Sequence, residues 1–60
     1  MNILRRRPGY WIVDNLVEKN LEVVYVLNGG GTFYRIGYGL ELRVESENFK
    51  FIQPFHIEDI

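Results

Sequence analysis

The segment that decides the fold is Leu40-Glu41-Leu42-Arg43-Val44-Glu45-Ser46-Glu47-Asn48-Phe49-Lys50-Phe51. Apolar and charged residues alternate in it on both sides of a polar break at residues 45–48. Such alternation is typical of β-strands with one buried face, because successive side chains of a strand point to opposite sides. We therefore predict a β-hairpin with Leu40, Leu42 and Val44 on the inward face. In this hairpin Val44 lies opposite Phe49, and Leu42 lies opposite Phe51.

Two further strands are predicted before the hairpin. The run 21–27, Leu-Glu-Val-Val-Tyr-Val-Leu, is β-branched and nearly continuous, which favours a central strand buried on both faces or nearly so. Asn28-Gly29 follows, and this pair is typical of a type I′ hairpin turn. Residues 32–38 resume as a strand with Tyr34, Ile36 and Tyr38 on one face and Phe33 and Arg35 on the other. Glycines at 37 and 39 indicate a bend.

The stretch 10–17 fits two structures. Its rings and β-branched residues favour a strand that ends at a polar turn over residues 18–20. Apolar residues also fall at helical spacing, and Asp14 or Asn15 could cap a short helix. We favour the strand. The alternative is an α+β fold in which a short helix near 14–20 packs on a three-stranded sheet.

The fold class predicted is mainly β. Four or five short antiparallel strands in meander order, with bends at glycines, indicate a small sheet that curls into a partly open barrel of SH3-like type. The 60 residues form a single small domain, with residues 1–9 a basic arm or edge strand and residues 54–60 a C-terminal tail.

Composition excludes several functions. The chain has no Cys and one His, so neither a disulfide nor an ordinary structural zinc site is expected. A net charge of −1 argues against a generic nucleic-acid coat. The charge is unevenly placed, because residues 1–9 carry three arginines and no acid. No targeting signal or membrane-length apolar run occurs, which predicts a cytoplasmic protein.

No residue pattern predicts catalysis or a cofactor. The run 28–31, Asn-Gly-Gly-Gly, lacks the Lys-Ser/Thr pair and the following helix of a phosphate-binding loop. His56 has Glu58 and Asp59 close by, but three neighbouring groups in a tail are more often solvated than preorganised. We predict that the protein is not an enzyme and holds no metal or cofactor.

The aromatic and arginine residues carry the partner prediction. Nine rings in so small a domain exceed what its core can hold, so some should be exposed at an interface. Arginine pairs with phosphates or carboxylates, and exposed rings offer a stacking surface. The partner-binding residues predicted on this basis are Arg5, Arg6, Arg7, Trp11, Tyr34, Arg35 and Tyr38.

The function expected is that of a small binding module that acts by protein–protein contact. Such a module would suit an accessory or inhibitory protein of the kind that phages encode. Homo-oligomers are also expected, because the chain is very small and has no disulfide or structural metal site to stabilise it. The alternative is binding of single-stranded nucleic acid, in which the arginine arm contacts phosphates and exposed rings stack on bases.

Overall fold

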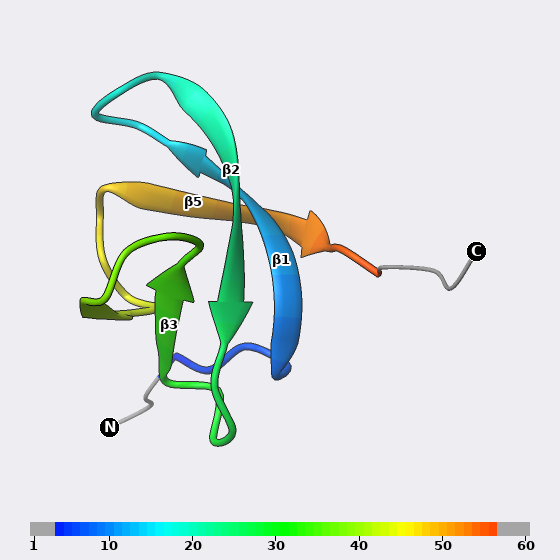
Figure 1. Cartoon of the computed structure of the whole chain (residues 1–60). Helices are drawn as coiled ribbons and strands as arrows, with labels where there is room; N and C mark the ends of the chain where they lie inside the picture. The colour runs from blue at the N-terminus through cyan, green and yellow to red at the C-terminus, as the bar shows by residue number, and fades with distance from the viewer. Residues whose placement is uncertain (1–3, 57–60) are drawn as a thin grey trace.

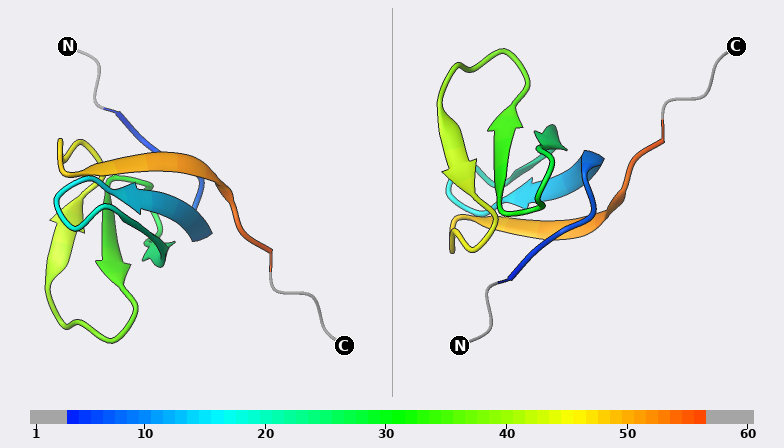
Figure 2. Two further views of the ribbon diagram at one scale, coloured as in Figure 1. Left: turned by 90° about the horizontal axis from the view of Figure 1, so that it is seen from above. Right: turned by 90° about the horizontal axis from the view of Figure 1, so that it is seen from below.

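The computed structural model describes residues 4–56 and shows an all-β fold of five strands in one antiparallel sheet (Figure 1). The strands are β1 (Gly9–Asn15), β2 (Asn20–Val26), β3 (Thr32–Arg35), β4 (Glu41–Arg43) and β5 (Phe49–Pro54). Their order in the sheet is β4-β3-β2-β1-β5, and β4 and β5 form its two edges. The sheet is strongly curved but not closed, and β3 and β4 cross β1 and β5 at a steep angle (Figure 2). The prediction of a mainly β, partly open small barrel is confirmed.

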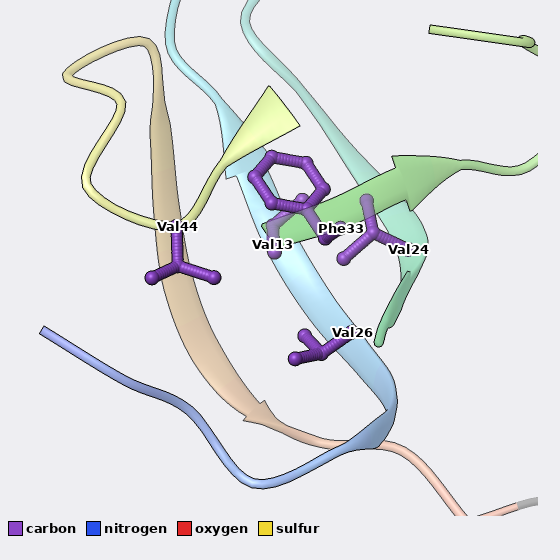
Figure 3. Packing of buried hydrophobic residues seen from close by; sticks show 5 residues of the cluster. All are labelled: Val13, Val24, Val26, Phe33 and Val44. Carbon is purple, nitrogen blue, oxygen red and sulfur yellow. The ribbon is translucent and has the colours of Figure 1, made fainter. Parts of the chain in front are cut away.

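The core lies inside this curvature. Val13, Val24, Val26 and Phe33 are fully buried, and Val44 is 2% exposed (Figure 3). They come from β1, β2, β3 and the turn after β4, so each part of the sheet contributes to one small cluster. Rings from the two ends of the chain complete the cluster: Trp11, Phe49 and Phe51 pack against it.

The predicted hairpin over residues 40–51 is wrong in its pairing. β4 pairs with β3, so that Leu42 lies opposite Phe33, whereas β5 pairs with β1, so that Phe51 lies opposite Val13. A turn closed by the Ser46 N–H, which donates to the Arg43 carbonyl at 3.0 Å, directs the chain from one edge of the sheet to the other. The inward orientation of the alternating residues is confirmed except at Leu40, which is 70% exposed.

The strand predicted over residues 10–17 is confirmed as β1, and the helical alternative is wrong. β1 ends at Asn15, and a turn over residues 16–19 leads into β2. Lys19 has φ 61° in this turn. Its N–H donates to the Asn15 carbonyl at 2.6 Å, which closes the turn.

β2 is central as predicted, but it is buried on one face only. Val24 and Val26 are fully buried, whereas Leu21 is 65% and Tyr25 is 39% exposed. The near-continuous apolar run reflects an exposed apolar outer face, because no layer covers that side of the sheet among the described residues.

The loop from β2 to β3 joins them as a hairpin but is not a type I′ turn. That turn needs positive φ at both central residues, and of Asn28 and Gly29 only Gly29 has it, at 97°. The Gly30 N–H donates to the Leu27 carbonyl at 3.0 Å, and Gly30 itself has φ 75°. The extra glycines therefore lengthen the loop and change its turn type.

β3 is shorter than predicted and ends at Arg35. A turn follows, in which the Tyr38 N–H donates to the Arg35 carbonyl at 3.0 Å and Gly37 has φ 89°. Phe33 and Arg35 share a face as predicted. Tyr38 does not share the face of Tyr34, because the turn reverses the chain between them.

Candidate binding groove

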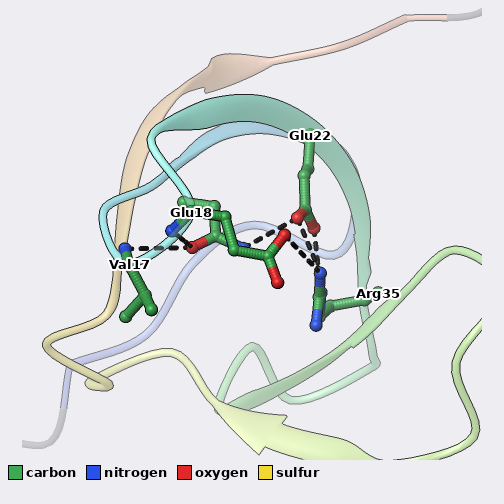
Figure 4. A network of polar contacts seen from close by, with 5 residues as sticks. Val17, Glu18, Glu22 and Arg35 are labelled. Atoms are coloured by element: carbon green, nitrogen blue, oxygen red, sulfur yellow. Dashed lines mark hydrogen bonds and ion pairs between the residues drawn. The ribbon is translucent and has the colours of Figure 1, made fainter.

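A polar network closes one end of the core. Arg35 donates from Nε to Glu22 Oε1 at 2.9 Å and from Nη2 to Glu22 Oε2 at 2.7 Å (Figure 4). Asn15 Nδ2 also donates to Glu22 Oε2, at 2.8 Å. Both side chains of the ion pair are largely covered, at 17% exposure for Arg35 and 16% for Glu22. A two-bonded guanidinium–carboxylate pair of this type fixes orientation as well as charge.

Asn15 is the residue that builds the network into the fold. It is 3% exposed at the end of β1, and its Oδ1 accepts hydrogen bonds from the N–H groups of Val17 at 3.1 Å and Glu18 at 3.0 Å. An asparagine side-chain oxygen in such a turn accepts hydrogen bonds from backbone N–H groups that have no strand partner there. Its amide group therefore organises the turn with its oxygen and holds Glu22 with its nitrogen.

Hydrogen bonding and burial shift the pKa values of Glu22 and Arg35 in opposite directions. The hydrogen bonds from Arg35 lower the pKa of Glu22 below its ordinary value of 4.5, aided by Asn15 and opposed by desolvation. The pKa of Arg35 is raised, first by the hydrogen bond to Glu22 and against desolvation. Glu18 lies farther away, with Oε1 at 4.0 Å from Arg35 Nη2, and its side chain is 58% exposed. It is therefore a weakly paired carboxylate at the rim.

Arg35 is also held by aromatic rings. Its Cζ lies 3.9 Å from the ring centroid of Tyr38 and 5.5 Å from that of Phe49. The turn after β3 brings Tyr38 back over the guanidinium. One face of the Tyr38 ring is thus used inside the protein, while its side chain remains 56% exposed.

A groove of about 580 Å³ opens beside this network, where the chain after β3 turns away from β2. Its walls combine apolar and aromatic side chains with the ion pair. The lining residues are Tyr10, Glu18, Asn20, Glu22, Val23, Arg35, Ile36 and Tyr38.

A row of tyrosines crosses the outer face of the sheet next to the groove. Tyr10 pairs with Tyr25 across β1 and β2, Tyr25 pairs with Tyr34 across β2 and β3, and Tyr34 pairs with Glu41. The rings of Tyr10 and Tyr25 meet edge to face with their centroids 5.0 Å apart. Tyr10 belongs both to this row and to the groove, so the two surfaces are continuous.

The predicted partner-binding residues separate into three places. Arg35 and Tyr38 come together in the groove, and Tyr34 lies in the outer tyrosine row. Arg6 packs inward, with Cζ 5.7 Å from the Trp11 ring centroid and 5.1 Å from that of Phe51. Its Nε is buried and has no hydrogen-bond partner among residues 4–56. A cation stacked on two rings in this way acts in packing.

The other arm residues remain at the surface. Arg5 Nη1 donates to the Gly29 carbonyl at 2.6 Å, and Trp11 Nε1 donates to the Arg7 carbonyl at 2.8 Å. Trp11 is half-buried against the core. A smaller hollow of about 230 Å³ lies here, lined by Arg7, Pro8, Gly9, Tyr10, Trp11, Pro54, Phe55 and His56.

Sequence reasoning missed several groove residues. Tyr10, Glu18, Asn20, Glu22, Val23 and Ile36 line the groove but were not predicted to bind a partner. One signal was present: Glu22 is the single charge in the apolar run 21–27, and Arg35 is the single charge in the run 32–38. Isolated charges in neighbouring apolar strands favour an ion pair, because a buried charge needs a partner.

Groups for metal or acid–base chemistry are sparse in the described part of the chain. Residues 4–56 contain no cluster of three or more His, Cys, Asp or Glu side chains that could hold a metal ion. His56 is exposed, whereas Glu58 and Asp59 lie outside the described residues. No helix long and apolar enough to cross a membrane occurs between residues 4 and 56.

Comparison with known proteins adds no relative: no family model, no curated protein and no solved structure matches this chain.

Proposed function

We propose that the protein is a non-catalytic binding module that recognises another protein through the groove. The observation that carries this proposal is the exposure of apolar and aromatic side chains around a rigid ion pair: Ile36 is 57%, Tyr38 is 56% and Tyr10 is 37% exposed. Exposed rings in a concave site favour recognition, because they supply contact area at little cost in side-chain entropy.

The polar groups of the groove favour binding over catalysis. Both Glu22 oxygens already accept hydrogen bonds, and its lowered pKa keeps it ionised near neutral pH. A general acid or base needs a pKa close to the working pH and a free position for the substrate proton. Glu22 and Arg35 have neither of these properties, and they act as a fixed wall of the groove.

The test is selection from a library of random peptides, followed by binding to variants. We expect enriched peptides to bind the native protein and to lose at least about tenfold in affinity for Ile36→Glu, which places a charge in the groove. Leu40→Glu is the matched control, because Leu40 is 70% exposed and does not line the groove. Enriched peptides that bind both variants like the native protein would contradict the proposal.

Binding of single-stranded nucleic acid is the second candidate, supported by the exposure of Arg5 and Arg7. It is the weaker one, because Arg6 is stacked on Trp11 and Phe51 and cannot extend to a phosphate from that position. A nucleic-acid complex through this arm would weaken steeply with salt and with Arg5→Ala and Arg7→Ala, whereas a complex in the groove should change little.

Self-association is proposed for the outer face of the sheet. Tyr25 is 39% and Leu21 is 65% exposed there. Light scattering during gel filtration tests the proposal, with Tyr25→Lys as the variant that should restore a monomer because it places a charge in an apolar contact. A monomeric native protein at high concentration would contradict it.

A further inference from the structure

One edge of the central strand is open along part of its length. β2 runs from Asn20 to Val26, but its pairing with β3 extends only from Val26 to Val24. Beyond Arg35 the chain turns, and the Tyr38 N–H bonds within that turn. The half of β2 that begins at Asn20 therefore has β1 on one side and the groove on the other.

The hydrogen-bond pattern shows which main-chain groups face the groove. The Leu27 N–H donates to the Thr32 carbonyl at 3.0 Å, so the odd-numbered residues of β2 direct their N–H and C=O groups toward β3. By this alternation the main-chain groups of Leu21 and the N–H of Val23 point to the side of β2 away from β1, where Val23 lines the groove. Within residues 4–56 these three groups have no hydrogen-bond partner on that side.

The side chains beside this edge differ between the two faces. Leu21 and Val23 lie on the outer face with Tyr10, where Ile12 is opposite Val23 and Asp14 is opposite Leu21. On the other face two carboxylates, Glu18 and Glu22, stand against the single guanidinium of Arg35, which leaves one negative charge in excess. Glu18 carries that excess because Glu22 is fully paired.

We propose that the groove binds an extended segment of another polypeptide, which adds as a strand to β2 beside Leu21 and Val23. Its alternate side chains are apolar on the outer side and basic on the Glu18 side. This inference rests on the proposed function and names its ligand. Main-chain hydrogen bonds to the open edge supply affinity, and the two faces supply selectivity, as in other cases of strand addition.

The test uses blocked hexapeptides in which valine alternates with lysine or with glutamate. The valine–lysine peptide should bind at least about tenfold more tightly, because like charges beside Glu18 repel. Glu18→Gln should weaken its binding about threefold, as expected for one partly exposed charge pair. Equal affinity for both peptides would contradict the predicted basic side chain.

Strand addition itself is tested by backbone methylation and amide hydrogen exchange. N-methylation of one alternate set of peptide nitrogens should abolish binding, and methylation of the other set should leave it within about twofold, because only one set faces β2. If methylation of the valine nitrogens abolishes binding, the peptide lies antiparallel to β2. If methylation of the lysine nitrogens abolishes binding, the peptide lies parallel to β2. In the complex the Leu21 and Val23 amides should become protected, while that of Tyr25, already opposite Tyr34, should not change.

The outcomes separate this inference from the proposed function. A peptide that shifts the Ile36 and Tyr38 signals without protecting Leu21 and Val23 would refute strand addition and leave the groove as a binding site. If neither these peptides nor the random library bind the groove, both proposals fail. Protection of the Leu21 and Val23 amides that rises with the concentration of the free protein, and does so in Tyr25→Lys as well, would mean that a second copy occupies the edge, which would also overturn the inference.

Discussion

Gly30 explains why the loop between β2 and β3 is rich in glycine. It is buried, has φ 75°, and its carbonyl accepts the Arg6 N–H at 2.8 Å. A Cβ atom at this position would overlap the Arg6 carbonyl oxygen. The glycine therefore permits both the left-handed backbone and the close approach of the N-terminal arm.

Three glycine substitutions should separate the effect of the left-handed backbone from that of the close approach of the arm. Gly30→Ala is expected to destabilise the fold by about 2 kcal/mol or more, because strain and overlap add. Gly29→Ala, with φ 97° but open space, should cost roughly 1 kcal/mol. Gly39→Ala, with neither problem, should stay within about 0.5 kcal/mol. Urea unfolding measures all three, and an equal cost at Gly30 and Gly29 would contradict the close approach of the arm to Gly30.

The Glu22–Arg35 pair predicts an acid-dependent stability. The folded pKa of Glu22 lies below the ordinary value of 4.5, so the folded state binds a proton less readily than the unfolded chain. Its contribution is complete above about pH 5 and is lost as the pH falls through the folded pKa. Thermal unfolding between about pH 3 and pH 6 should show a decline toward acid that is smaller in Glu22→Gln. Arg35→Gln should also reduce it, and an unchanged decline in both variants would contradict the role of the pair.

For the strands, the alternation of apolar and polar residues predicted the buried face better than it predicted which strands pair with each other. Leu42, Val44, Phe49 and Phe51 all point inward as the pattern indicates. The pattern contains no information on which strand lies alongside, because any strand with the same period can supply the neighbour. The polar break at 45–48 is typical of a hairpin turn, yet here it links the two edges of a curved sheet. Contacts between residues that are distant in sequence thus decided the pairing.

The open edge of β2 predicts an uneven exchange pattern within one strand. In the free protein the Leu21 and Val23 amides should exchange with solvent much faster than that of Tyr25, since only Tyr25 has β3 alongside. Two-dimensional NMR after transfer into heavy water measures this directly. Equal protection of the three amides would show that the edge is already covered.

For the whole molecule, Phe33 connects β3 with the edge strand β5 across the core. Its ring meets Phe49 and Phe51 edge to face, with centroids 5.4 Å and 5.2 Å apart. β3 and β5 are not neighbours in the sheet, so these ring contacts join two separate strands across the core.

Truncation of this ring should therefore be the most damaging single change. Phe33→Ala is expected to cost about 3 to 5 kcal/mol, enough to unfold a domain of this size under native conditions. Tyr34→Ala, the next residue but on the outer face, should cost far less. Circular dichroism with urea titration compares them, and similar losses at the two positions would contradict the assigned core.

The groove was only partly predictable, because it arises from the fold and not from a motif. Arg35 and Tyr38 could be named as binding residues from their chemistry, but only the turn after β3 stacks them. Arg6 has the same chemistry and yet lies against Trp11 and Phe51, since the arm docks on the β2–β3 loop. Side-chain type alone does not distinguish a packed arginine from a free one.

Binding of a protein segment in the groove of this small barrel can be tested by one NMR titration. The labelled protein is titrated separately with the valine–lysine peptide and with a single-stranded oligonucleotide at low salt. The peptide should shift the signals of Val23, Ile36 and Tyr38, and the oligonucleotide should leave them unchanged. Shifts confined to Arg5, Arg7 and Trp11, caused by the oligonucleotide and removed by salt, would contradict binding of a protein segment in the groove.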